Sequence, residues 1–237
     1  MEFTIDGVKV SGKEGQTILQ VAQEYNIHIP TLCHNESLSD YGACRVCLVE
    51  LKYPTWSRLV TSCLYPAKEG LEVLTKSEWV LKTRRGVVEL LLARCPEADA
   101  VKRLAEELGL KEANPRYVKN SKDEKCVLCG MCIRACEEVV GVSAIHFSGH
   151  GATRKVCTPY DEANPVCIGC GSCAYVCPTN VIPFEDLGAI RKIWHREFQM
   201  RKCEKCGVYY IPKAQVEFMK KNLNIPDEFF NNCPDCR

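Results

Sequence analysis

The chain has 237 residues, of which 46% are hydrophobic and 26% are charged, as in an ordinary globular protein, and its formal net charge is +1. So balanced a charge favours neither nucleic acid nor an anionic membrane as a partner. No apolar run reaches the ~18 residues of a membrane-spanning helix, and the start M-E-F-T-I-D-G lacks the basic and apolar segments of a secretory signal, so we expect a cytoplasmic protein without direct membrane insertion.

Residues 1–76 are predicted to form a small α+β domain. Asp6-Gly7 stands between two short β-prone segments, residues 3–5 and 8–10, which is a strong signal for a two-residue hairpin turn. A helix is expected over residues 17–25, and Pro30 then prevents further helix and opens a loop that carries cysteine. Further strands are expected at residues 47–51, 59–61 and 71–74.

Three more domains are predicted after residue 76. Residues 77–117 form a helical connector, in which Ser77 caps a first helix, Pro96 ends it, and Gly109 ends a second helix. Residues 118–190 hold two cysteine runs of equal spacing and form an approximate internal repeat. Residues 191–237 form a small tail domain with a helix over residues 213–222 and a miniature core of Phe218, Phe229 and Phe230. The expected fold class is therefore α+β and multidomain.

The cysteines define the class of the protein. Sixteen of the 18 lie in groups that contain Cys-x-x-Cys, the spacing that lets neighbouring thiolates converge on one metal centre. Disulfides are disfavoured, because a chain without an export signal stays in a compartment that keeps thiols reduced. The sequence therefore predicts a protein that binds metal through cysteine.

The first group consists of Cys33, Cys44, Cys47 and Cys63, in the arrangement C-x10-C-x2-C-x15-C. Four thiolates are the ligand set of a [2Fe–2S] cluster, although the first spacing is longer than in plant-type ferredoxins. Zinc is the alternative for four cysteines. A Rieske centre would need two histidines, and His34 stands alone, so we expect it to be a supporting or surface residue.

The two runs of the repeat are C-V-L-C-G-M-C-I-R-A-C and C-I-G-C-G-S-C-A-Y-V-C-P, each with the spacing C-x2-C-x2-C-x3-C. Three closely spaced thiolates hold three corners of a cubane cluster, and the fourth ligand comes from the other run. One [4Fe–4S] cluster is therefore assigned to Cys126, Cys129, Cys132 and Cys177, and the other to Cys136, Cys167, Cys170 and Cys173. These runs resemble those of bacterial two-[4Fe–4S] ferredoxin domains; a pair of zinc sites is the alternative.

The tail carries Cys203, Cys206, Cys233 and Cys236 in the pairs C-E-K-C-G and C-P-D-C-R. Two such pairs present four thiolates in a tetrahedron, the pattern of a zinc ribbon. Rubredoxin-type sites hold mononuclear iron on similar pairs. We favour zinc, then iron, and lastly a further iron–sulfur cluster.

A wider resemblance covers about the first 185 residues. The segments I-P-T-L-C-H, G-A-C-R-V-C-L-V-E, T-S-C-L-Y-P and R-R-G-V-V-E-L-L-L-A-R are similar to the large iron–sulfur subunit of respiratory complex I and to iron–sulfur subunits of NAD-linked hydrogenases and formate dehydrogenases. The resemblance implies a β-grasp fold for the [2Fe–2S] domain. The family usually has a His and three Cys for another [4Fe–4S] cluster after it. Only Cys95 stands there, so we expect that cluster to be absent and Cys95, like Cys157, to be a packing residue.

The resemblance implies electron transfer without catalytic residues in this chain. The expected partners are a flavoprotein that uses NAD(P), or a ferredoxin, on one side and a hydrogenase, formate dehydrogenase or similar catalytic subunit on the other. Two other classes of function stay open at this stage: an iron–sulfur redox sensor or regulator, and a maturation factor for metal cofactors. A sensor is disfavoured because three clusters in series suit transport, and because no DNA-reading element is recognisable.

Overall fold

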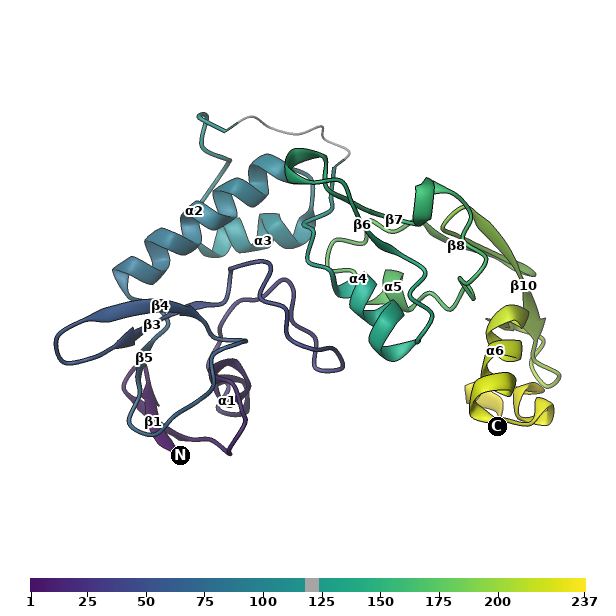
Figure 1. Cartoon of the computed structure of the whole chain (residues 1–237), viewed down its shortest axis with the longest axis horizontal. Helices are drawn as coiled ribbons and strands as arrows, with labels where there is room; N and C mark the ends of the chain where they lie inside the picture. Colours follow the sequence, from purple (N-terminus) through teal and green to yellow (C-terminus); the bar gives the residue numbers. More distant parts are fainter. Residues whose placement is uncertain (118–123) are drawn as a thin grey trace. The chain divides into compact units, whose positions relative to one another are not determined.

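A computed structural model describes residues 1–117 and 124–237, which divide into two compact units, Met1–Gly130 and Met131–Arg237 (Figure 1). The predicted boundary between the connector and the ferredoxin-like domain falls at residues 117 and 118, so its second side lies outside the described residues. Each unit is described by itself below.

The first unit begins with the predicted hairpin. Its strands are antiparallel and pair from Glu2 with Ser11 to Ile5 with Val8. Asp6 and Gly7 both have positive φ, 50° and 80°, as a two-residue turn between right-twisted strands requires. The strands of this unit are β1 (Glu2–Ile5), β2 (Val8–Ser11), β3 (Leu48–Lys52), β4 (Ser57–Thr61) and β5 (Glu72–Leu74).

The five strands form one mixed sheet in the order β2-β1-β5-β3-β4, in which only the β1–β5 pair is parallel. The predicted helix is α1 (Ile18–Glu24), and Thr17 caps it, because the Thr17 side chain accepts from the Gln20 amide and the Gln20 side chain accepts from the Thr17 amide. Buried apolar residues of α1 and of the strands share one core, which includes Ile5, Leu19 and Val49. A mixed sheet of this order around one helix is a β-grasp fold.

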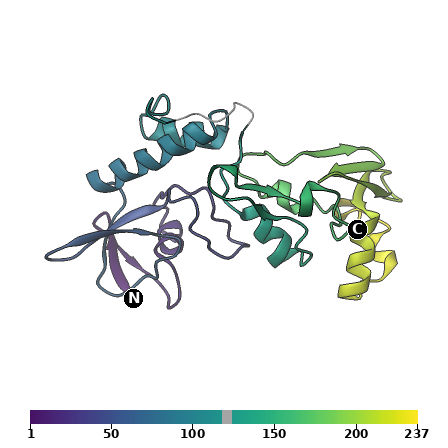
Figure 2. The same ribbon diagram turned by 45° about the horizontal axis from the view of Figure 1, so that its top comes forward.

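Two helices follow the sheet, as predicted. Helix α2 (Glu78–Arg94) starts where the Ser77 hydroxyl accepts from the Val80 amide, and α3 (Asp99–Glu107) ends before Gly109, whose φ is 71°. The two helices pack against each other, and Figure 2 shows them side by side. Helix α2 also packs on β3 of the same unit.

One buried arginine ties α2 to the cysteine loop. Arg84 is 4% exposed and donates from Nε to the Val46 carbonyl at 2.9 Å and from Nη2 to the Leu48 carbonyl at 2.6 Å. These two carbonyls lie on either side of Cys47. Because the Arg84 guanidinium is charged and donates to both carbonyls, it holds the backbone around Cys47, a predicted cluster ligand, in place.

The second unit starts with the end of the first cysteine run. Each run passes into a short helix, which is the structural counterpart of the repeat in the sequence. The elements of this part are α4 (Met131–Arg134), a π-helical turn (Ala135–Val139), β6 (His146–Ser148), β7 (Lys155–Cys157) and α5 (Ser172–Tyr175). Strands β6 and β7 form a two-stranded antiparallel sheet, and 3₁₀ turns lie at Gly151–Thr153 and Pro159–Asp161.

A four-stranded sheet then runs into the tail in the order β11-β10-β9-β8, with every pair antiparallel. Its strands are β8 (Phe184–Leu187), β9 (Ile190–Ile193), β10 (Arg196–Lys202) and β11 (Tyr209–Pro212). The predicted helix is α6 (Lys213–Leu223), and 3₁₀ turns follow at Asp227–Phe230 and Pro234–Cys236 (Figure 1). The sheet is continuous across residue 190, where the sequence predicted one domain to end.

The predicted core of the tail is only partly right. Phe230 is 1% exposed and Phe218 is half-buried, but Phe229 is 43% exposed and its ring lies 3.8 Å from the Arg237 guanidinium carbon. The chain as a whole has helices and strands that are segregated along the sequence, which is the predicted α+β class. Among the described residues, no helix combines the length and the apolar character that crossing a membrane requires.

Candidate metal centres

The first cysteine group comes together at one end of the β-grasp sheet. Cys33 and Cys44 lie on the loop between α1 and β3, Cys47 directly precedes β3, and Cys63 follows β4. Because Leu48 pairs with Thr61 in these two strands, Cys47 and Cys63 are neighbours, and their sulfurs are 3.5 Å apart. The Cys44 amide donates to the Cys33 sulfur at 3.5 Å. All four thiols are buried.

The four thiols cannot all ionise by themselves. Hydrogen bonding between the Cys47 and Cys63 sulfurs lowers the pKa of the Cys47 thiol to about 6, whereas side-chain hydrogen bonding with Cys33 and Cys47 raises the pKa values of Cys44 and Cys63, with burial adding to both. Buried negative charges this close oppose one another. Bound metal cations relieve that opposition and make four thiolates compatible, so the donor set fits a metal centre.

His34 is not at the surface. Its side chain is 8% exposed, and its Nδ1 lies 2.7 Å from Asp40 Oδ1. Its Nε2 is buried and has no hydrogen-bond partner among the residues that the structure describes. Asp40 thus orients the ring next to Cys33, which agrees with a supporting residue.

Four cysteines of the two runs line one cavity within the second unit. Cys136, Cys167, Cys170 and Cys173 surround about 330 Å³ of space free of protein atoms, part of it open to solvent, together with apolar groups such as Ile145. The Ala144 amide donates to the Cys136 sulfur at 3.2 Å. Burial raises the pKa of Cys173 to about 12 and also raises that of Cys136 and of Cys167, so these thiols ionise only beside a cation.

The remaining cysteines of the runs are divided between the units. In the first unit, the Cys126 carbonyl accepts from Arg94 Nε at 3.0 Å, and the Cys126 amide donates to Glu124 at 2.7 Å. In the second unit, Cys132 and Cys177 belong to the same apolar cluster. Cys129, of the first unit, is buried.

Residues that sequence reasoning missed hold the second run in place. Arg196 Nη1 donates to the carbonyls of Asn164, Pro165 and Cys167, and Arg191 Nη1 donates to the Gly169 carbonyl at 3.1 Å. Both arginines come from β9 and β10, in R-K-I-W-H-R, a segment without the alternation of charged and apolar residues that would have signalled a strand. Asp186 in turn pairs with the Arg191 guanidinium through both carboxylate oxygens.

Two glycines of the second run permit this close packing. A Cβ on Gly169 would lie 2.6 Å from the Phe198 ring, and a Cβ on Gly171 would lie 2.5 Å from the Phe184 ring. Both glycines also have positive φ, 71° and 82°. The sheet therefore packs directly against the backbone of the cysteine loop, as only glycine allows.

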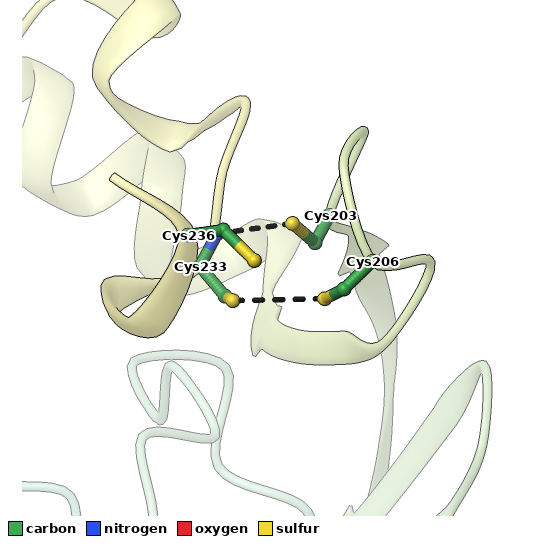
Figure 3. A group of neighbouring side chains, drawn as sticks. All are labelled: Cys203, Cys206, Cys233 and Cys236. Atoms are coloured by element: carbon green, nitrogen blue, oxygen red, sulfur yellow. Dashed lines mark hydrogen bonds between the residues drawn. The ribbon is translucent and has the colours of Figure 1, made fainter.

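The tail cysteines form a compact group, shown in Figure 3. The sulfurs of Cys203, Cys206, Cys233 and Cys236 all lie within 4.8 Å of one another, and those of Cys206 and Cys233 are 3.7 Å apart. Thiolates bound tetrahedrally at about 2.3 Å to one metal are separated by about 3.8 Å. Backbone N–H groups of Cys206 and Cys233 lower the pKa of the Cys203 thiol to about 6. This group fits a single metal ion.

Neither remaining cysteine lies in a group of this kind. Cys95 is 0% exposed at the end of α2, and its thiol donates to the Cys126 carbonyl at 3.2 Å. Cys157 is 6% exposed at the end of β7. Both are buried, as the sequence indicated, but Cys95 also makes a polar contact beside a predicted ligand.

Two domain families match the chain. Residues 1–78 match the family described as 2Fe-2S iron-sulfur cluster binding domain, and residues 166–208 match the 4Fe-4S dicluster domain. The second match contains the second cysteine run and also Cys203 and Cys206, but not the first run. The chain thus contains a [2Fe–2S] domain and a [4Fe–4S] ferredoxin domain.

Relatives exist among known proteins over most of the chain. The NADPH-Fe(3+) oxidoreductase subunit alpha of Geobacter sulfurreducens is 31% identical over 94% of this chain and 28% of its own length. The NADP-reducing hydrogenase subunit HndD of Solidesulfovibrio fructosivorans is 33% identical over 77% of this chain and 36% of its own length. The mitochondrial NADH-ubiquinone oxidoreductase 78 kDa subunit of Candida albicans is 30% identical over 82% of this chain and 30% of its own length.

Among solved structures, a chain of an NAD+-reducing [NiFe]-hydrogenase in the H2-reduced state matches with a TM-score of 0.57 and 29% identity. The match covers 66% of this chain and 74% of that one. This chain spans about a third or less of the curated relatives it matches.

Proposed function

Because this chain belongs with the iron–sulfur subunits of NADH- and NADPH-linked oxidoreductases and hydrogenases, we propose that it relays electrons between two other subunits of such a complex. The donor side is a flavoprotein that uses NAD(P), or a ferredoxin module, and the acceptor side is a hydrogenase, formate dehydrogenase or similar subunit. The direction of flow is open. The chain itself performs no substrate chemistry.

Three centres serve the relay in this proposal. Cys33, Cys44, Cys47 and Cys63 hold one [2Fe–2S] cluster. One [4Fe–4S] cluster takes Cys126, Cys129, Cys132 and Cys177, and the other takes Cys136, Cys167, Cys170 and Cys173. The domains proposed for these sites are residues 1–76 and 118–190, joined by the connector 77–117 and followed by the tail 191–237.

The observation that supports metal binding by these thiols is the way N–H groups point at sulfur in both ferredoxin domains. The Cys44 amide donates to Cys33, the Ala144 amide to Cys136, and the Trp194 indole to Cys173, at 3.2–3.5 Å. Donors of this kind stabilise a thiolate, the form that binds iron. The same donors suit zinc, so the family relationship, rather than the geometry, favours iron–sulfur clusters.

The surrounding protein residues hold the backbone of the proposed ligands in place. Arg84 holds the carbonyls beside Cys47, and Arg196 holds the carbonyl of Cys167 together with two others before it. The clusters, when bound, supply one-electron redox chemistry whose potential depends on burial and on hydrogen bonds to sulfur. A rigid frame also keeps the geometry the same in both redox states.

The tail group of four cysteines is proposed to hold one zinc ion, with mononuclear iron as the alternative. A structural role is supported by the small size of this region, which has one fully buried large side chain, Phe230, beside the cysteines. A domain this small gains much of its folding free energy from a bound metal.

Metal analysis of anaerobically purified protein tests the cofactors. We expect about ten iron atoms, about ten acid-labile sulfides and about one zinc per chain, from one two-iron and two four-iron clusters plus the tail site. Eleven irons without zinc would favour iron in the tail. A colourless sample without sulfide would refute the proposal.

The relay itself is tested on the complex purified from the native source. Its visible iron–sulfur absorption is followed by stopped flow after mixing with NADH, NADPH or H2. We expect bleaching within the turnover time of the complex with at least one of them. Reduction by none of the three, nor by formate or reduced ferredoxin, with dithionite still able to bleach the clusters, would favour the sensor or maturation function instead.

The tail is proposed as a docking element for one partner subunit. Deleting residues 191–237 would also remove Arg191 and Arg196, so a better test is Cys233→Ala, with Asp235→Ala as the control at an exposed position of the same turn. We expect Cys233→Ala to lose the tail metal and to recover less partner on co-purification, whereas Asp235→Ala keeps both. Unchanged assembly after metal loss would refute docking through this element.

A further inference from the structure

Trp194 occupies an unusual turn between β9 and β10. It and His195 both have positive φ, 50° and 61°. A two-residue hairpin turn of this kind is normally built from Asn and Gly, because bulky side chains are unfavourable at positive φ. An indole held there despite this preference points to a function for the side chain at that place.

The indole reaches the proposed [4Fe–4S] site. Its Nε1–H donates to the Cys173 sulfur at 3.3 Å, and the ring lines the same cavity as Cys136, Cys167 and Cys170. The indole nitrogen can only donate a hydrogen bond. Its single N–H is therefore matched to an electron-rich acceptor such as a thiolate sulfur.

The neighbours of Trp194 fix its position. Arg196, two residues later, donates to the Cys167 carbonyl, and Arg191, three residues earlier, donates to the Gly169 carbonyl. The turn is thereby anchored to the cysteine loop on both sides. Phe198 of the same strand packs on Gly169 as well. The hydrogen bond from Trp194 to Cys173 is thus part of a rigid arrangement.

We propose that Trp194 sets the reduction potential of the centre held by Cys136, Cys167, Cys170 and Cys173. The inference rests on the proposed function and names a residue that adjusts the reduction potential of one of its centres. Reduction adds one negative charge to the cluster and its thiolates. A hydrogen bond to sulfur stabilises the reduced state more than the oxidised one, so this donor raises the potential. Trp194 is a positioning residue here, because it acts through Cys173.

The test is Trp194→Phe, which keeps an aromatic ring and removes the N–H. Redox titration followed by EPR should show one of the three centres shifted to lower potential. At fixed potential its ratio of reduced to oxidised form should fall by roughly fivefold, because one hydrogen bond to a charged group is lost, which corresponds to about 40 mV at 59 mV per tenfold. The other two centres serve as internal controls, and Trp79→Phe, at an exposed position on α2, serves as the matched variant.

Three unshifted potentials in Trp194→Phe would overturn the inference, and so would an equal shift of all three. If this variant does not fold, the proposal is tested on the wild-type protein instead. With ¹⁵N-labelled indole, the reduced centre should show a hyperfine coupling to ¹⁵N in pulsed EPR, and its absence would overturn the inference. A preparation with no iron–sulfur signal refutes the proposed function as well, so the two failures are distinguishable.

Discussion

The two cysteine runs have the same spacing, yet different structures hold them. The first run begins at Cys126, whose carbonyl accepts from Arg94 and Cys95 at the end of α2. The second run begins at Cys167, whose carbonyl accepts from Arg196 on a strand of the tail sheet. The spacing predicts the ligand set. The residues that hydrogen-bond to or pack on the backbone of a run, called its frame below, influence the electrostatics and the rigidity of each site.

The second run has the more extensive frame among the described residues. Arg196 donates to three carbonyls and Arg191 to one close carbonyl of that loop, while aromatic rings pack on Gly169 and Gly171. We therefore expect the two proposed [4Fe–4S] centres to differ in potential, because the hydrogen bonds and the burial around them differ. A difference in potential between successive centres is what makes a relay directional.

The largest expected effect is loss of one centre. Cys170→Ala removes a proposed ligand of the second-run centre, and Cys129→Ala removes one of the first-run centre. We expect each variant to lose about four of about ten irons and one EPR signal, a different signal in each case, because a cubane needs its four thiolates.

A loss of about eight irons from either variant would contradict the view that the two runs are held independently. That result would mean that the two centres form one cooperative unit and that the separate frames do not stabilise them independently. A loss of about two irons from either variant would contradict the ligand assignment itself.

A smaller effect is expected from the arginines. Arg196→Met leaves the carbonyls of Asn164, Pro165 and Cys167 without this donor, whereas Arg94→Met removes a donor from the Cys126 carbonyl and an ion pair with Glu124. We expect Arg196→Met to destabilise its unit by about 2 kcal/mol and Arg94→Met by about 1 kcal/mol, because partly buried carbonyl acceptors lose a charged partner.

Iron release to a chelator under denaturant measures this difference. Iron of the second-run centre should leave first from Arg196→Met, as seen by which EPR signal declines. Lys192→Met, at an exposed position of the same sheet, is the control and should release iron like the wild type. Equal release from the two arginine variants would show that the frames are equivalent.

Local signals in the sequence predicted much of the fold. Asp6-Gly7 produced the hairpin turn, and Thr17 and Ser77 produced helix caps, because the causes lie within a few residues. In the first group Cys47 lies beside Cys63 and Cys44 beside Cys33, and the four tail cysteines form one compact group, while the ligand sets themselves stay predictions. The sequence could not distinguish buried Phe230 from exposed Phe229, since which of these neighbours turns inward depends on the 3₁₀ turn that contains both.

The residues that hold the second run in place could not be predicted from the sequence. Arg191, Trp194 and Arg196 lie in the segment assigned to a separate tail, and their contacts join residues 21 to 32 positions apart. Pairing over such distances depends on how the sheet packs on the loop, and periodicity within one strand carries no information on it. Arg84, whose carbonyl partners lie 36 and 38 positions away, was missed for the same reason.

The smallest effect is expected at Cys95, the one cysteine beside the first run that was assigned no metal. Burial raises the pKa of its thiol to about 12, so it is protonated at neutral pH and donates to the Cys126 carbonyl. Cys95→Ala should keep all the iron and destabilise the first unit by about 1 kcal/mol, through one weak hydrogen bond and a small cavity. Cys95→Ser, which keeps a donor, should recover part of that loss in denaturant unfolding. Loss of about four irons in Cys95→Ala would instead indicate that Cys95 is a cluster ligand. The end of α2 would then belong to the metal site of the first run.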